Sequence, residues 1–255
     1  MTAMNLIVQE RAKAAFVLTD TAYFDVLTGA VKAFGPKVHG IVIGEDAYVA
    51  VATSGRLFLH HVRPHLEAIR ASTLREFLAA MPDAFRAGEA DSLAEGGGGS
   101  CAAVIAAFDR AAGRAYGWGI GNNTMAFRAR PYSLVPTRKY LTGFDEEKYP
   151  ALADTEFGDP KCWNPAAQGV ELLEAQRADD FDLSLGFSAP AVGGQAVLTR
   201  VDRDGINHTT LKAWPDRLGC PIDLRLGDRL GWRDRLRAWG RETLRPVPTL
   251  HLPPS

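Results

Sequence analysis

Three neighbouring histidines have residue types and a spacing that could bind a metal ion. His60, His61 and His65 include a pair four residues apart, a spacing that on a helix can bring two imidazoles to one metal. Pro64 lies within this segment, and no HExxH glutamate accompanies the histidines. We therefore expect a solvated or interface-facing helix here, and no metal.

A glycine-rich stretch and two ionisable residues could also carry chemistry. Gly117–Asn123 (GWGIGNN) has neither the GxGxxG nor the GK[ST] spacing of phosphate-binding loops, so we expect a strand end and turn, and no cofactor. Lys37 follows Pro36 at a predicted strand start, where a solvated lysine is common. Asp20 closes a predicted strand, where it can accept backbone hydrogen bonds. Neither residue alone indicates catalysis.

Composition limits the classes of partner. The chain has 255 residues, 46% hydrophobic and 23% charged, enough for one large core or two modest ones. A formal charge of −1 and a pI near 6.6 give no overall attraction to nucleic acid or acidic lipid. We expect neither nucleic acid nor membrane as a partner.

The cysteines and the amino-terminal segment indicate a compartment. Cys101, Cys162 and Cys220 form no CxxC pair, which fits a reducing environment and argues against a zinc ribbon or a disulfide framework. The first residues lack the apolar region of a signal peptide, and no run approaches the roughly 20 apolar residues of a membrane helix. We expect a cytoplasmic protein.

Short apolar runs in the first fifty residues predict antiparallel strands. The connectors Arg11–Lys13 and Gly44–Asp46 are too short for a crossover helix, so adjacent runs must form hairpins. The runs barely alternate, which indicates that both faces are covered, by a second sheet and by helices. The predicted strands are residues 5–10, 14–19, 37–43 and 47–52.

Helices and further strands follow. Val62, Leu66 and Ile69 indicate one helix, and a capping box at Thr73 and Glu76 starts a second. We interpret the glycines of residues 96–100 as a loop, although a domain linker has the same composition. Later strands are expected at residues 101–108 and 114–120 and in a hairpin over 195–214, with a helix over 168–177 and irregular chain over 130–165.

This order predicts an α+β fold, with two antiparallel sheets packed between helical layers in a four-layer αββα sandwich. We assign residues 1–215 to this domain and residues 216–255 to a carboxy-terminal amphipathic helix and Pro-rich tail. In that segment Trp232 and Trp239 share a face with Leu236. The face could dock on its own domain or contact another subunit.

Four motifs in residues 4–55 occur in an order that resembles the start of proteasome β subunits, members of the N-terminal nucleophile (Ntn) hydrolases. They are Thr19-Asp20-Thr21, a polar loop with Asp25 and Thr28-Gly29, Gly35-Pro36-Lys37-Val38, and Ala52-Thr53-Ser54-Gly55. Residues 169–177 and 192–195 resemble the family's late helix and the glycine pair that enters a hairpin. The likeness covers about four fifths of the chain and implies the same four-layer fold.

The resemblance also implies a chemistry. In these hydrolases the first residue of the processed chain attacks an amide carbonyl and its own α-amino group accepts the proton, with a lysine and an aspartate beside it. Lys37 and Asp20 match those two positions. The family's spacing from Asp20 leads back to Met4, which has no hydroxyl or thiol, so Thr2, exposed by removal of Met1, is the candidate nucleophile.

Two functions remain open from the sequence. One is a threonine-type peptidase or amidohydrolase that uses Thr2, Asp20 and Lys37 on a peptide or other amide, without a cofactor. The other is a catalytically inactive structural or assembly subunit with the same fold. In both cases the resemblance implies a homo-oligomer.

Overall fold

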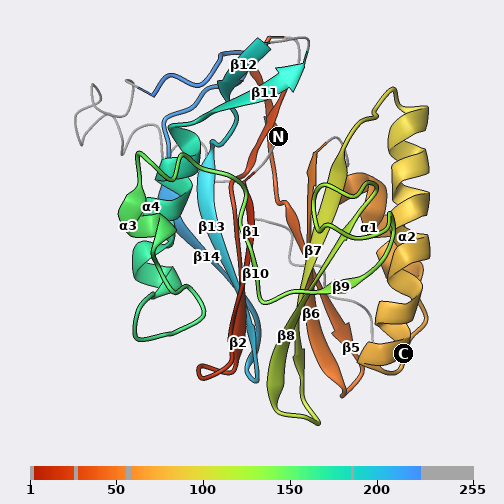
Figure 1. Cartoon of the computed structure of the whole chain (residues 1–255). Coiled ribbons are helices and arrows are strands. Elements are labelled where there is room, and N and C mark those ends of the chain that lie inside the picture. The colour runs from red at the N-terminus through yellow and green to blue at the C-terminus, as the bar shows by residue number, and fades with distance from the viewer. Residues whose placement is uncertain (1–2, 26–27, 56–58, 185–186, 225–255) are drawn as a thin grey trace.

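The computed structural model describes residues 3–25, 28–55, 59–184 and 187–224. Within them the chain forms four layers (Figure 1), with two five-stranded antiparallel sheets face to face, helices α1 and α2 outside one sheet, and α3 and α4 outside the other. The predicted αββα sandwich is confirmed. No helix of this described part is long and apolar enough to span a membrane.

The first sheet has the order β10-β1-β2-β13-β14. Strands β1 and β2 pair without a bulge, from Gln9 opposite Ala14 to Met4 opposite Thr19. This unbroken register fixes which residue of β1 lies beside the end of β2. The strands are β1 (Met4–Gln9), β2 (Ala14–Thr19), β10 (Lys139–Tyr140), β13 (Gln195–Asp202) and β14 (Gly205–Ala213).

The second sheet has the order β5-β6-β7-β8-β9 and carries α1 (Leu59–Ala68) and α2 (Leu74–Ala94) on its outer face. The predicted capping box at the start of α2 is confirmed, because the Glu76 amide donates to the Thr73 hydroxyl at 3.2 Å. The strands are β5 (Val38–Ile43), β6 (Ala47–Gly55), β7 (Cys101–Asp109), β8 (Arg114–Gly121) and β9 (Val135–Pro136).

Three apolar clusters fill the spaces between the layers. On β1, Leu6 and Val8 belong to the cluster between the sheets, whereas Ile7 belongs to the one under α4 (Pro165–Arg177). All six β1 residues are buried. Burial of both faces explains why the sequence of this strand does not alternate.

Several short elements differ from the sequence predictions. The expected loop after Asp20 contains the hairpin β3 (Ala22–Phe24) and β4 (Val31–Phe34), and a further hairpin joins β11 (Asp180–Ser184) and β12 (Phe187–Pro190). The stretch expected to be irregular contains β9, β10 and α3 (Pro150–Ala153). Strands of two to five residues leave little periodicity to detect. The predicted helix containing Trp232 and Trp239 lies outside the described residues, as does Thr2.

Candidate functional site

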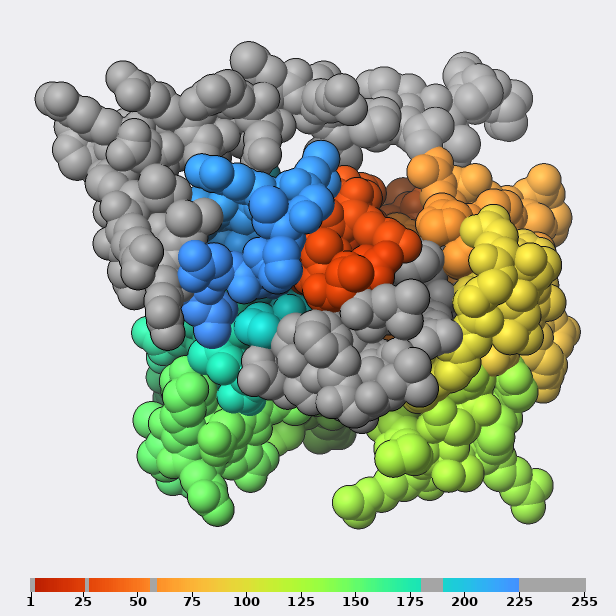
Figure 2. All heavy atoms as spheres, turned by 90° about the horizontal axis from the view of Figure 1, so that it is seen from above, coloured from red at the N-terminus to blue at the C-terminus, as the bar shows by residue number. Residues whose placement is uncertain are grey.

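Lys37 and Asp20 form a buried ion pair at one end of the sandwich. The Lys37 Nζ atom lies 2.7 Å from Asp20 Oδ1, and the two side chains are 2% and 0% exposed. Asp20 directly follows β2 of one sheet, and Lys37 directly precedes β5 of the other. The pair therefore joins the two sheets. In the view onto this end (Figure 2), the red-orange early part of the chain lies between the blue segment and the orange and yellow helices.

Backbone amides hold the Asp20 carboxylate in place. The Ala3 N–H donates to Oδ1 at 3.2 Å, and the amides of Ala22 and Gly193 donate to Oδ2 at 3.2 and 3.0 Å. The carboxylate thus connects the beginning of the described chain with the entry to β13. Its orientation toward Lys37 is fixed by three donors from separate segments.

Burial changes the acidity of both partners. Loss of water around the ammonium lowers the pKa of Lys37 below its ordinary value, although the charge of Asp20 opposes this shift. Burial likewise raises the pKa of Asp20, against the effect of Lys37 and the amide donors. The Lys37 Nζ atom also lies 5.2 Å from the Tyr23 ring centroid. Burial therefore makes the neutral amine of Lys37 easier to form than that of a solvated lysine.

Met4 lies at the end of β1, beside this pair. Its side chain is fully buried in the cluster between the sheets. Its N–H donates to Thr142 Oγ1 at 2.8 Å, and the Thr142 hydroxyl donates to the Met4 carbonyl at 3.0 Å. A thioether has no proton to give up and cannot attack a carbonyl. Met4 therefore cannot be the nucleophile.

The structure brings together two of the three residues predicted for the site, Asp20 and Lys37. Thr2 is outside the described residues, which begin at Ala3. Thr142 was missed, because it lies in the stretch expected to be irregular and 138 residues from Met4. In the sequence, Thr142 is a single hydroxyl residue after Lys139–Tyr140, a strand too short to be predicted.

A second buried ion pair, also missed, lies next to the first. Arg177 donates to both carboxylate oxygens of Asp216, at 2.8 and 2.6 Å, and to the Val192 carbonyl at 2.7 Å. The Gly194 amide donates to Asp216 as well, at 2.8 Å. Gly193 and Gly194, adjacent in sequence, thus bind the two buried aspartates.

Two groups of side chains in the described part of the chain have ligand types and separations compatible with a metal ion. One is His60, His61 and Glu95, and the other is Glu156, Asp159 and Cys162. Neither includes Asp20 or Lys37. The candidate site at the end of the sandwich is thus a lysine–aspartate site.

Two antiparallel sheets packed face to face between helical layers form the four-layer αββα arrangement that the sequence resemblance implied. Solved structures of Anbu, described as an ancestral β-subunit, share it. A Gly-1 mutant of Anbu from Hyphomicrobium sp. strain MC1 has a TM-score of 0.57 at 12% identity, over 95% of this chain and 97% of that chain.

Two further Anbu structures agree. The helical assembly of the Anbu complex from Pseudomonas aeruginosa gives a TM-score of 0.55 at 15% identity, over 100% and 99% of the two chains. Anbu from Yersinia bercovieri gives 0.52 at 12% identity, over 99% and 100%. No family model and no curated protein sequence matches the chain. The likeness shows that this chain shares the fold of the Anbu structures.

Proposed function

We propose that this chain is a non-catalytic, proteasome-related subunit that serves as a building block of a homo-oligomer. The observation that carries the proposal is Met4, which lies opposite Thr19 at the end of β1, beside the buried Asp20 and Lys37. In an Ntn hydrolase this is the place of the attacking hydroxyl or thiol.

The environment of Met4 is incompatible with catalysis by that residue. Its nitrogen is a peptide amide that donates to Thr142, so it is not a basic α-amino group. Thr2 precedes Met4 by two residues, and two residues of extended strand advance about 6–7 Å. Reacting groups must approach to about 3.5 Å. Because β1 and β2 pair without a bulge, Met4 itself keeps its place opposite Thr19.

The assembly role is supported by the fold neighbours. The Pseudomonas aeruginosa Anbu structure is described as a helical assembly, and it matches this chain over nearly the whole length of both. From this likeness we infer that this chain also self-associates. A subunit can keep this role without a nucleophile, because packing between subunits does not require one.

The second candidate is a threonine-type amidohydrolase that uses Thr2. It is favoured by the hydrogen bond from the amide of Ala3, the next residue, to Asp20 at 3.2 Å, and by the lowered pKa of the buried Lys37. After removal of Met1, the Thr2 hydroxyl would attack an amide carbonyl and its own α-amino group would take the proton. The amine of the substrate would leave, and water would then release the acyl group.

Intact-mass analysis, amino-terminal sequencing and labelling with a peptide epoxyketone distinguish the two candidates. For a non-catalytic subunit we expect no adduct and no peptide turnover above that of the variants Thr2→Ala and Lys37→Ala. A free Thr2 amino terminus that forms an adduct, lost in Thr2→Ala, would establish the hydrolase instead.

Light scattering tests the assembly role. We expect a mass well above that of the 27.6 kDa chain. A protein that stays monomeric at high concentration would contradict the proposal, even if no peptidase activity were found.

A further inference from the structure

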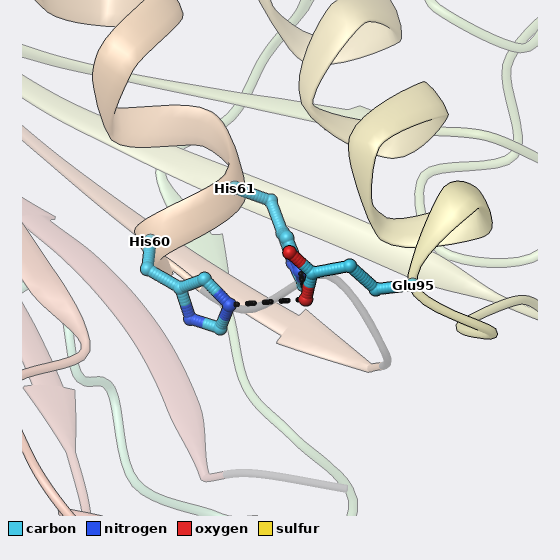
Figure 3. A group of neighbouring side chains, drawn as sticks. All are labelled: His60, His61 and Glu95. Carbon is cyan, nitrogen blue, oxygen red and sulfur yellow. Dashed lines mark hydrogen bonds and ion pairs between the residues drawn. The ribbon is translucent and has the colours of Figure 1, made fainter.

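Three side chains converge where α1 meets the end of α2 (Figure 3). The Nε2 atoms of His60 and His61 lie 3.7 and 2.9 Å from the same oxygen of Glu95, Oε2. The three ligand atoms all lie within 4.8 Å of one another. Two imidazoles of α1 and one carboxylate at the end of α2 therefore point into one small volume.

Close packing of the two helices creates this convergence. A Cβ atom on Gly88 of α2 would lie 2.9 Å from Val62 Cα and 3.1 Å from the His61 carbonyl oxygen. The glycine permits a contact between α1 and α2 that a larger residue would prevent. His61 directly precedes Val62, and Glu95 is the C-cap of α2. The helix contact thus brings residues 34 positions apart into reach.

The cluster combines one fixed side chain with two that can adjust. The His61 side chain is 4% exposed, whereas those of His60 and Glu95 are 64% and 66% exposed. The two imidazole rings lie with centroids 3.9 Å apart. A ligand could enter from solvent and keep water molecules on its open side.

The charge distribution at this end of α2 favours a cation. Asp91 and Glu95 lie at the carboxy-terminal end, and the last turn contains no basic residue. That end of a helix carries partial negative charge, so carboxylates there are unfavourable unless a positive group offsets them.

We propose that His60, His61 and Glu95 form a binding site for a divalent transition-metal ion of the Zn²⁺ type. Zn²⁺ binds nitrogen and carboxylate oxygen at about 2.0–2.2 Å in tetrahedral sites, which puts neighbouring ligand atoms about 3.3 Å apart. The separations of 2.9 and 3.7 Å lie on either side of this value. Imidazole ligands favour Zn²⁺, Co²⁺ or Ni²⁺ over Ca²⁺ and Mg²⁺.

This ligand set differs from the one considered in the sequence. The pair four residues apart, His61 and His65, does not converge on one point, because His65 binds Asp91 at 2.7 Å instead. Glu95 supplies the third ligand from α2. It was missed because only the contact between the helices brings it close.

The test uses the untagged full chain, with Zn²⁺ as the probe in calorimetry and Co²⁺ in visible absorption. We expect one ion at this site per chain and Co²⁺ bands typical of mixed nitrogen and oxygen ligands. Changing an outer-shell partner typically weakens metal binding about 10–100-fold, so His60→Ala and Glu95→Gln, which remove direct ligands, should weaken it at least as much. Both side chains are mostly exposed, so both variants should fold, which circular dichroism checks.

Two controls define the site. His65→Ala removes a histidine of the same helix that lies outside the ligand set, and it should leave the affinity within about twofold. Cys162→Ser removes a ligand of the other candidate group and should likewise leave the Co²⁺ bands in place. The proposal would be overturned if the wild-type chain bound no Zn²⁺ or Co²⁺. It would also be overturned if His60→Ala and Glu95→Gln bound the ions as tightly as the wild-type chain. These readouts are independent of whether the chain cleaves amides or assembles.

Discussion

The two buried ion pairs at the end of the sandwich differ in the cation they use. Asp20 pairs with Lys37 and Asp216 with Arg177, and both pairs are almost completely shielded from solvent. Adjacent amides link them, since Gly193 donates to Asp20 and Gly194 to Asp216. The two pairs are therefore held by the same short backbone segment, but their cations differ in whether they can lose a proton.

The arginine pair has the properties of a structural clamp. Arg177 makes two parallel bonds to Asp216 and a third to the Val192 carbonyl, and its guanidinium lies 4.9 Å from the Trp214 ring centroid. A guanidinium does not lose its proton in a protein. Lys37, by contrast, has a lowered pKa and can exist as a neutral amine. Of the two buried cations, only Lys37 can give up its proton.

The largest effect is expected for Asp216→Asn. The substitution leaves the Arg177 charge buried without a carboxylate, a situation that typically costs about 3–5 kcal/mol. Urea unfolding at neutral pH measures the loss. The matched control is Asp204→Asn, because Asp204 pairs with Arg203 at the surface, with side chains 68% and 82% exposed, and should change stability by less than about 1 kcal/mol. Equal effects of the two substitutions would show that the buried clamp contributes little.

A smaller, pH-dependent effect is expected for Asp20→Asn. Lys37 then loses the charge that raises its pKa, and because an amine can give up its proton whereas a guanidinium stays charged, the cost should stay below that of Asp216→Asn. Between the lowered folded pKa of Lys37 and its ordinary value of 10.5, the unfolded chain binds more protons, so stability rises with pH. The rise approaches about 1.4 kcal/mol per pH unit. Urea titrations at several pH values measure it.

Lys37→Met should have the opposite pH dependence to Asp20→Asn. Without the ammonium, burial raises the pKa of Asp20 further, and the folded state holds a proton that the unfolded state releases. Stability should then fall as pH rises through the raised pKa. Asp216→Asn leaves both Asp20 and Lys37 in place, so its profile should show neither of these two changes. Parallel profiles for all three variants would refute the distinction between the lysine and arginine pairs.

Much of the fold could be predicted because its strongest signals are local. The β1–β2 hairpin follows from two apolar runs and a three-residue connector, and the start of α2 follows from Thr73 and Glu76. Strand β10 had no comparable signal. It has two residues and exists because Leu6 and Ile7 of β1 pair with it across the sequence.

The site was predictable only in part. Asp20 and Lys37 were singled out by the order of motifs around them, since neither burial nor mutual contact follows from a lone aspartate and lysine. The Arg177–Asp216 pair spans 39 residues, and although Arg177 ends the segment 169–177 that resembles the family's late helix, no motif includes Asp216. Such contacts depend on how helices and loops pack, which residue spacing does not encode.

The smallest effect is expected for Gly193→Ala, which acts on the link between the two pairs. A Cβ atom there would lie 2.7 Å from Asp216 Oδ2 and 2.8 Å from Ile222 Cδ1. The end of the Ile222 side chain can shift, but Asp216 is held by Arg177 and the Gly194 amide, so the cost should be about 1–2 kcal/mol, in the lower half of the range for overpacking. The Gly193 amide can still donate to Asp20, so the pH dependence of urea unfolding should stay that of wild type. A profile shifted toward that of Asp20→Asn would instead mean that strain at the arginine pair reaches Lys37.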